Sequence, residues 1–251
     1  MSTGFSRQVE ERFRRGAAHY ASGALLQRAV AWRLVHCLHQ QPLPEGPWAD
    51  LGAGSGAVAL ALQHQAPQLL LQHRSLQVDL SAALLAQNPL ARQQLLWDLN
   101  QGLPQGLEGA ALLTSSFALQ WLDEPALQLG SWCRTLRPGG LLALAVPTAG
   151  SFRQWHQAAE RSGVPCTALP LPNAEALVST ACDQLELVRC QRLRFSRPTS
   201  GLALLQHMRV IGADASRNPG LNAGQLRRLL RHWPEGPTTW EVLLLLGRRR
   251  P

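Results

Sequence analysis

Residues 48–60 read WADLGAGSGAVAL, and this stretch decides the fold. A short apolar run ends at Asp50, glycines follow at 52, 54 and 56, and an apolar pattern with helical spacing begins after them. Glycines at the end of a strand permit a tight turn and let a ligand approach the backbone closely. In open α/β sheets, ligands bind at this carboxyl end of the strands. The stretch therefore predicts a strand, a ligand-binding turn and a helix in succession.

The spacing of these glycines argues against a dinucleotide as the ligand. Dinucleotide-binding turns carry G-x-G-x-x-G, whereas the third glycine here follows the second by two positions only. Asp50 stands just before the turn, where its charge would repel a pyrophosphate and attract a cation. S-adenosylmethionine, which carries a sulfonium and an amino group, is a ligand of that kind.

Strands and helices alternate around the turn. We expect further strands at 75–79, 93–97, 109–115 and 141–147 and helices near 56–65, 80–87 and 123–136, with a turn at 137–140. The stretch between the glycine turn and Asp79 we interpret as containing a loop insertion. Such alternation predicts a mostly parallel sheet covered by helices on both faces.

The two ends of the chain have a different pattern. Residues 7–41 read as helical, and residues after 147 alternate late helices with a long strand at 185–195 and a last strand at 239–247. A chain of 251 residues suits a single domain. We expect an N-terminal helical lid at 1–45, a cofactor-binding core at 46–147, and substrate-lid insertions with the last strands at 148–251.

Composition excludes several classes of protein. All 24 basic residues are Arg, so lysine Schiff-base chemistry and a phosphate-loop lysine are excluded. The five cysteines include no Cys-x-x-Cys pair, and we expect neither a disulfide framework nor a metal site. We expect a cytoplasmic protein, because no apolar run is long enough to span a membrane and the N-terminus lacks a signal-peptide core. The net charge of +8 reflects either a preference for Arg or an anionic partner.

Carboxylates at three successive strand ends predict a cofactor site. Asp79 can accept hydrogen bonds from both ribose hydroxyls of S-adenosylmethionine, and Asp98 can accept one from its adenine amino group. Taken singly, Asp79 could instead cap a helix and Asp98 could close a turn. The predicted cofactor-binding residues are Asp50, Gly52, Ala53, Gly54, Gly56, Asp79, Leu80, Asp98, Leu99 and Ser115.

The motifs VDLS, WDLNQGLP and CRTLRPGGLLAL resemble those of the class I S-adenosylmethionine-dependent methyltransferases. FRRGAAHYASGALLQRA near the N-terminus, SSFALQWLDE after the fourth strand, and MRVIGAD, QLRRLLRHWP and TTWEVLLLLG near the C-terminus are more specific. They resemble the malonyl-acyl-carrier-protein O-methyltransferases of biotin synthesis (BioC type). The resemblance implies a Rossmann-like fold with a seven-stranded, mostly parallel sheet, helices on both faces and helical lid insertions. Ala53 stands where this family usually has Cys.

The resemblance also implies a reaction, in which the sulfonium methyl group moves to the free carboxylate of a malonyl thioester on the way to pimeloyl chains. A carboxylate with a pKa of about 4 is ionised at pH 7, so no general base is needed. We expect Arg209 to contact the substrate carboxylate, although an exposed helix arginine is the alternative. Tyr20 and Trp121 are expected at the catalytic site, where each could also serve only in packing.

The implied partner is an acyl carrier protein, or coenzyme A, bearing the malonyl group. Carrier proteins are acidic, so arginines beside the site would speed the encounter; the candidates are Arg7, Arg12, Arg14, Arg15, Arg227, Arg228 and Arg231.

Two other functions stay open: methylation of another small carboxylic acid, and a methyltransferase-like binding or assembly factor. A nucleic-acid substrate is disfavoured, because no Asn-Pro-Pro-Tyr type of motif follows the fourth strand.

Overall fold

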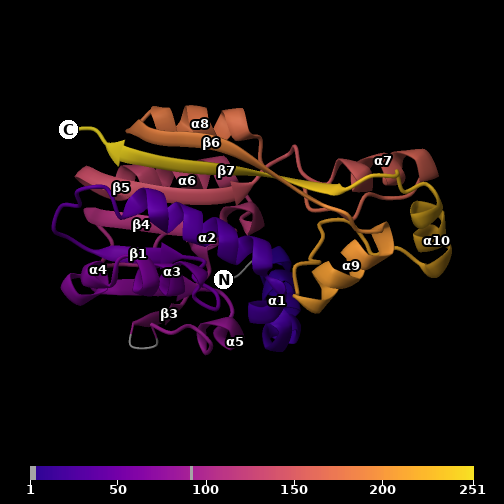
Figure 1. Cartoon of the computed structure of the whole chain (residues 1–251), viewed down its shortest axis with the longest axis horizontal. Coiled ribbons are helices and arrows are strands. Elements are labelled where there is room, and N and C mark those ends of the chain that lie inside the picture. Colours follow the sequence, from indigo (N-terminus) through magenta and orange to yellow (C-terminus); the bar gives the residue numbers. More distant parts are fainter. Residues whose placement is uncertain (1–3, 91–92) are drawn as a thin grey trace.

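The computed structural model describes residues 4–90 and 93–251. Within them the chain forms one seven-stranded sheet with strand order β3-β2-β1-β4-β5-β7-β6 (Figure 1). The strands are β1 (Trp48–Leu51), β2 (Ser75–Asp79), β3 (Gln94–Leu96), β4 (Ala110–Ser116), β5 (Leu136–Pro147), β6 (Leu185–Arg197) and β7 (Thr238–Arg249).

The strand directions place the ligand site. β3, β2, β1, β4 and β5 pair in parallel, and β7 runs antiparallel between β5 and β6. The chain order reverses between β1 and β4, which lie side by side in the centre of the sheet. Because ligands bind beyond the carboxyl ends of the strands at such a reversal, the glycine turn after β1 lies at the expected place. The predicted class of fold is confirmed.

Helices cover both faces of the sheet. α2 (Leu25–Leu38), α3 (Ala57–Gln65) and α4 (Pro67–Gln72) share one apolar core with the sheet, in which Trp48 is fully buried. α6 (Pro125–Thr135) and α8 (Ala174–Cys182) share a second core on the other face, around Trp132. These two sets of buried side chains hold helices on both faces of the sheet, as the sequence predicted.

Two local expectations are wrong. The insertion after the glycine turn is not a loop, because Pro67 stands at the first position of helix α4, where its fixed φ suits a helix start. Residues 137–140 are not a separate turn but lie within β5, where the pairing with β4 shifts register between Ala110 and Leu112. Gly139 has φ +77°, and a Cβ on Gly140 would lie 2.7 Å from the Ala110 carbonyl oxygen. The pairing passes from Leu136 directly to Leu141, so residues 137–140 form an irregular bulge of this strand at the two glycines.

A helical extension projects from one end of the sheet (Figure 1). β6 and β7 continue past the sheet as a two-stranded ribbon that reaches α7 (Arg153–Ser162), α9 (Gly201–Val210) and α10 (Ala223–Arg231). These helices pack around an apolar cluster of their own, which includes Phe152, Trp155, Leu204 and Leu229. Among the described residues, no helix combines the length and apolar character needed to cross a membrane.

Helix α1 (Gly4–Gly23) lies between the sheet and the helical extension, in contact with α5 (Ala82–Leu85) and α9 (Figure 1). A Cβ on Gly16 would lie 2.4 Å from the backbone nitrogen of Gly212, so the two backbones meet directly. Arg12 pairs with Asp214 at 3.2 Å beside this contact. The first helix therefore joins the two parts of the molecule.

Candidate functional site

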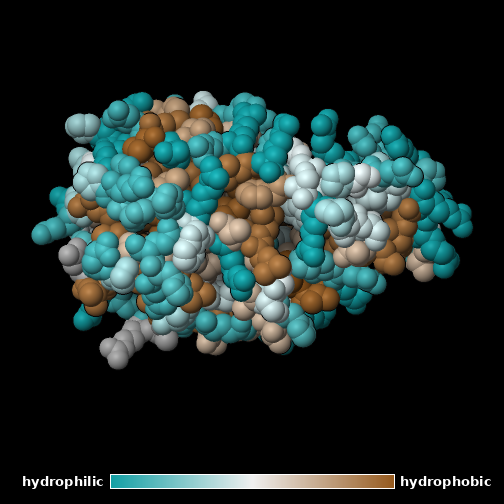
Figure 2. Space-filling view, in the orientation of Figure 1, coloured by the Kyte–Doolittle hydropathy of each residue, from teal (hydrophilic) through white to brown (hydrophobic). Residues whose placement is uncertain are grey.

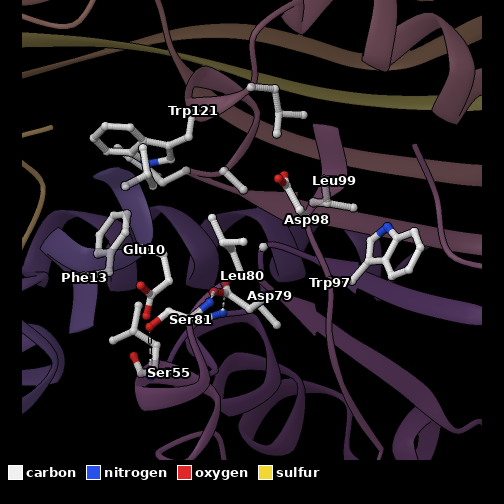
Figure 3. A pocket seen from close by; sticks show the side chains of 18 of the residues that line it. Glu10, Phe13, Ser55, Asp79, Leu80, Ser81, Trp97, Asp98, Leu99 and Trp121 are labelled. Carbon is white, nitrogen blue, oxygen red and sulfur yellow. Dashed lines mark hydrogen bonds between the residues drawn. The ribbon is translucent and has the colours of Figure 1, made fainter. Parts of the chain in front are cut away.

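A cavity lies over the carboxyl ends of β1, β2 and β4, and α1 closes it from above the sheet (Figure 3). Its volume is about 90 Å³. Of the predicted cofactor residues, the lining contains Gly52, Ala53, Gly54, Asp79, Leu80, Asp98 and Leu99. The structure thus brings seven of the ten predicted cofactor residues to one cavity.

Asp79, at the end of β2, is held by backbone donors. The N–H of Gly54 donates to its Oδ2 at 2.8 Å, and the N–H of Ser81 donates to its Oδ1 at 2.7 Å. Burial raises the pKa of Asp79 to about 6, and the backbone hydrogen bonds from Ser81, Gly54 and Leu80 oppose that rise. A carboxylate has about four acceptor positions, so Asp79 keeps acceptor capacity for a ligand hydroxyl.

Asp50 lies outside the lining of the cavity. It is buried, and Thr114 Oγ1 donates to its Oδ1 at 2.7 Å. Burial raises the pKa of Asp50 to about 7, the Thr114 hydrogen bond lowers it, and the charge of Asp79 raises it. Asp50 is therefore bonded to β4 and has no direct contact with the cavity.

Asp98, after β3, presents an acceptor that nothing in the described chain satisfies. Its Oδ1 accepts from the N–H of Asn100 at 3.0 Å, whereas its buried Oδ2 has no hydrogen-bond partner. The Asn100 side chain donates to Ser6 Oγ of α1 at 2.9 Å and accepts from the N–H of Asp123 at 2.8 Å. Asn100 therefore fastens α1 over the Asp98 end of the cavity.

Two predicted residues point elsewhere. Ser115 is fully buried and donates to the Leu51 carbonyl at 2.8 Å, while its neighbour Ser116 lines the cavity, because successive residues of a strand face opposite ways. Gly56 does not line the cavity either. Its φ is +84°, and a Cβ there would lie 2.8 Å from Asn88 Oδ1, so Gly56 serves the packing of the turn.

The charges around the cavity select the ligand. Glu10, Asp79 and Asp98 line it, and among the described lining residues there is no Arg or His (Figure 3). Such a lining disfavours phosphates and favours a cation. The residues present fit S-adenosylmethionine, since they offer acceptors for its hydroxyls and amino groups and carboxylates beside its positive charges.

An aromatic partition separates this cavity from a second one. Phe13 contacts both Tyr20 and Trp121 edge to face, with ring centroids 5.7 and 5.4 Å apart. All three residues line both cavities. Burial, and then the charge of Asp79, raise the pKa of Tyr20 well above its ordinary range, so its hydroxyl stays neutral. The two predicted site residues Tyr20 and Trp121 thus lie where the cofactor cavity ends.

Comparison with known proteins identifies the family. Residues 49–144 match the family model described as "Methyltransferase domain". The chain is 34% identical to malonyl-[acyl-carrier protein] O-methyltransferase of Alcanivorax borkumensis, over 94% of this chain and 84% of that protein. The chain belongs to the malonyl-[acyl-carrier protein] O-methyltransferase family. The resemblance inferred from the motifs is confirmed.

Two further comparisons agree with this family and fold. The biotin biosynthesis bifunctional protein BioCD of Bordetella avium is 31% identical over 90% of this chain, which spans 49% of that longer protein. Among solved structures, geranyl diphosphate C-methyltransferase of Streptomyces coelicolor A3(2), in complex with S-adenosyl-L-homocysteine, superposes with a TM-score of 0.53. It is 16% identical and matches over 88% of this chain and 78% of its own, so the likeness shows the fold.

Arg209 does not lie where a ligand of the substrate carboxylate is expected. It is exposed on α9 and lines neither cavity. Its helix neighbours His207 and Met208 line the second cavity instead, together with Arg197 from the end of β6. The sequence predicted the right segment and the wrong face of the helix.

Sequence reasoning missed the residues that α1 contributes to the cofactor cavity: Ser6, Val9, Glu10 and Phe13. Their positions recur at helical spacing on one face of α1, and this periodicity was the available signal. It also missed Phe117, which has the unusual φ of 57° and lines both cavities.

Proposed function

We propose that the chain transfers the methyl group of S-adenosylmethionine to the free carboxylate of a malonyl thioester, as a step in biotin precursor synthesis. The observation that carries the proposal is the pairing of two cavities across one aromatic partition. One cavity is lined by carboxylates and fits a cationic cofactor, and the other is mostly apolar and large enough for an acyl thioester. The family of the chain supports the same reaction.

The cofactor would be held by groups whose acceptor atoms are free. Asp79 accepts a ribose hydroxyl, and Asp98 Oδ2 accepts the adenine amino group between Leu99 and Trp97. Glu10 of α1 faces the same cavity and offers a carboxylate to the ammonium group (Figure 3). When bound, S-adenosylmethionine supplies an electrophilic methyl group.

The reaction requires positioning and not proton transfer. With both ligands bound, a carboxylate oxygen would form the new O–C bond while the electron pair of the broken C–S bond stayed on sulfur. The negative carboxylate and the positive sulfonium would neutralise each other, so a water-poor surrounding favours the transition state. Phe13, Tyr20 and Trp121 exclude water at the partition, and the neutral Tyr20 hydroxyl can orient the carboxylate by donating a hydrogen bond.

The acyl group would arrive on an acyl carrier protein or on coenzyme A. Of the arginines considered for carrier encounter, Arg12 pairs with Asp214, and Arg14 and Arg15 pair with Glu11. Those on α10, Arg227, Arg228 and Arg231, are exposed. Arg7 is exposed as well, and no ion pair among the described residues includes it. These four are the better candidates for steering an acidic carrier. The cytoplasmic location stays a prediction.

The test is methyl transfer from labelled S-adenosylmethionine to purified malonyl-acyl carrier protein. Acetyl- and succinyl-acyl carrier proteins are the substrate controls, and Asp79→Ala is the inactive variant. We expect a base-labile ester on the malonyl thioester alone. Transfer to free dicarboxylic acids only would instead support another small-acid methyltransferase, and cofactor binding with no transfer to any acid would support a binding factor.

A further inference from the structure

The second cavity is larger than a malonyl group requires. It has a volume of about 450 Å³ and lies between the end of α1, the start of α2 and the helical extension. Apolar side chains gather where the sheet meets this extension (Figure 2). The aromatic lining comprises Phe13, Tyr20, Phe117, Trp121, Phe152, Trp155, Phe195 and Trp240. A three-carbon acyl group at the partition would leave most of this space to another part of the substrate.

Of the described residues, one arginine, Arg197, lines this cavity. Its side chain is exposed, so it lies where the cavity meets solvent. Within residues 4–90 and 93–251, no acidic group pairs with it. Asp214, the acid of the same lining, is held by Arg12 at 3.2 Å. The cavity therefore has an unpaired positive charge near solvent.

His207 of α9 adds a second nitrogen group to this place. Burial, and then the charge of Arg197, lower the pKa of His207. The two groups are therefore close enough to repel each other when both are charged. An anion between them would remove that repulsion and accept hydrogen bonds from both. Neither residue lines the cofactor cavity, so this anion is not the carboxylate that receives the methyl group.

Three buried polar atoms along the same cavity lack partners within the described chain. Gln120 Oε1 and Asp214 Oδ1 are acceptors, and Trp155 Nε1 is a donor. The Gln120 Nε2 donates to the Phe117 carbonyl at 2.7 Å, which fixes the side chain and leaves the oxygen orphaned. Buried polar atoms without partners are rare and call for a ligand group. An amide group offers the complementary donor and acceptor.

We propose that the second cavity is the channel for the pantetheine arm of the malonyl thioester, with the phosphate of that arm bound between Arg197 and His207. This inference rests on the proposed function and names the part of the substrate that occupies its second cavity. The arm carries two amides between the thioester and the phosphate. This agrees with an apolar channel that has unpaired polar atoms along its wall and that contains Arg197 and His207. The same arm occurs in acyl carrier proteins and in coenzyme A.

The decisive experiment compares three malonyl thioesters, those of acyl carrier protein, coenzyme A and N-acetylcysteamine. The last has one amide and no phosphate. We expect Arg197→Gln to lower kcat/KM by about tenfold for the first two substrates and less than about twofold for the third. His207→Gln should follow the same pattern with a smaller loss. Arg189→Gln, on the same strand but exposed and outside both cavities, is the matched control and should leave all three unchanged.

An equal loss on all three thioesters would overturn the proposal, since it would place Arg197 at the acyl group or in a structural role. A loss with the carrier protein alone would also overturn it, and would assign Arg197 to carrier docking. Binding distinguishes this failure from failure of the proposed reaction. By calorimetry, the wild-type protein should bind 4′-phosphopantetheine about tenfold more tightly than pantetheine, and Arg197→Gln should abolish that difference. Absence of the difference in the wild type would overturn the phosphate site even if methyl transfer occurs.

Discussion

The backbone N–H of Gly54 donates a 2.8 Å hydrogen bond to Oδ2 of Asp79, which joins the turn after β1 to the end of β2. The N–H groups of Gly52 and Ala53 donate to the Val78 carbonyl at 2.8 and 2.9 Å, beside the same connection. The carboxylate therefore orders the glycine turn before any ligand binds. This relationship makes Asp79 a support of the cavity as well as a ligand of the cofactor.

Asp79→Asn should weaken cofactor binding more than a single lost ligand contact would. One side of the carboxamide is a donor, so it must face the N–H of Gly54 or of Ser81 and leave it unsatisfied. We expect S-adenosylhomocysteine affinity to fall at least tenfold, to judge from the energy of hydrogen bonds to charged groups. Calorimetry measures this effect. The exposed Asp183→Asn is the control, and unchanged affinity in Asp79→Asn would refute the assignment.

The buried carboxylates predict a pH-dependent stability. The pKa of Asp50 is raised to about 7 and that of Asp79 to about 6, above the ordinary value of 3.8, so the folded state holds protons that the unfolded state has released. Their contribution to stability is therefore lost as pH rises from about 4 toward 7. Asp50→Asn mimics the protonated carboxyl and can still accept the Thr114 hydrogen bond. Its melting temperature should rise relative to the wild type between pH 5 and pH 8, and a constant difference would contradict the prediction.

Phe13→Ala should open the partition between the two cavities. The ring makes edge-to-face contacts with Tyr20 and Trp121, each worth about 0.5–1.5 kcal/mol beyond the buried area. Its loss admits water beside the reacting carboxylate and loosens Tyr20. We expect kcat to fall by about tenfold, with a smaller loss in Phe13→Leu, which keeps an apolar side chain. A wild-type kcat in Phe13→Ala would show that the partition is not needed for methyl transfer.

Gly16→Ala should detach α1 from the helical extension. The added Cβ would lie 2.4 Å from the Gly212 nitrogen, and overpacking of this kind costs about 1–3 kcal/mol. We expect faster proteolysis of α1 and weaker cofactor binding, because the same helix covers the cavity. Gly4→Ala is the matched control, since no atom lies within 4 Å of its added Cβ. Equal proteolysis rates in the two variants would disprove the close contact as the anchor of α1.

The strand-end residues were predictable because local sequence fixes them. A strand ending in closely spaced glycines places its own turn at the sheet edge, and parallel strands bring Asp79 and Asp98 to that same edge. The third strand, expected at 93–97, is found at Gln94–Leu96, and the last strand, expected at 239–247, at Thr238–Arg249. Such boundaries depend on pairing partners, and the sequence pattern approximates them only to within a few residues.

The sequence by itself determined the fold class, the ligand-binding edge of the sheet and the acids that mark it, because the period of apolar residues and the turn chemistry are local properties. Only the tertiary structure decided which neighbour faces a cavity: Ser116 and not Ser115, Met208 and not Arg209. It also decided that α1 roofs the cofactor cavity, through the meeting of Gly16 with Gly212. A one-residue change of position reverses the direction of a side chain on a strand and turns it by about 100° on a helix. Packing between distant segments sets that direction, and no local pattern records it.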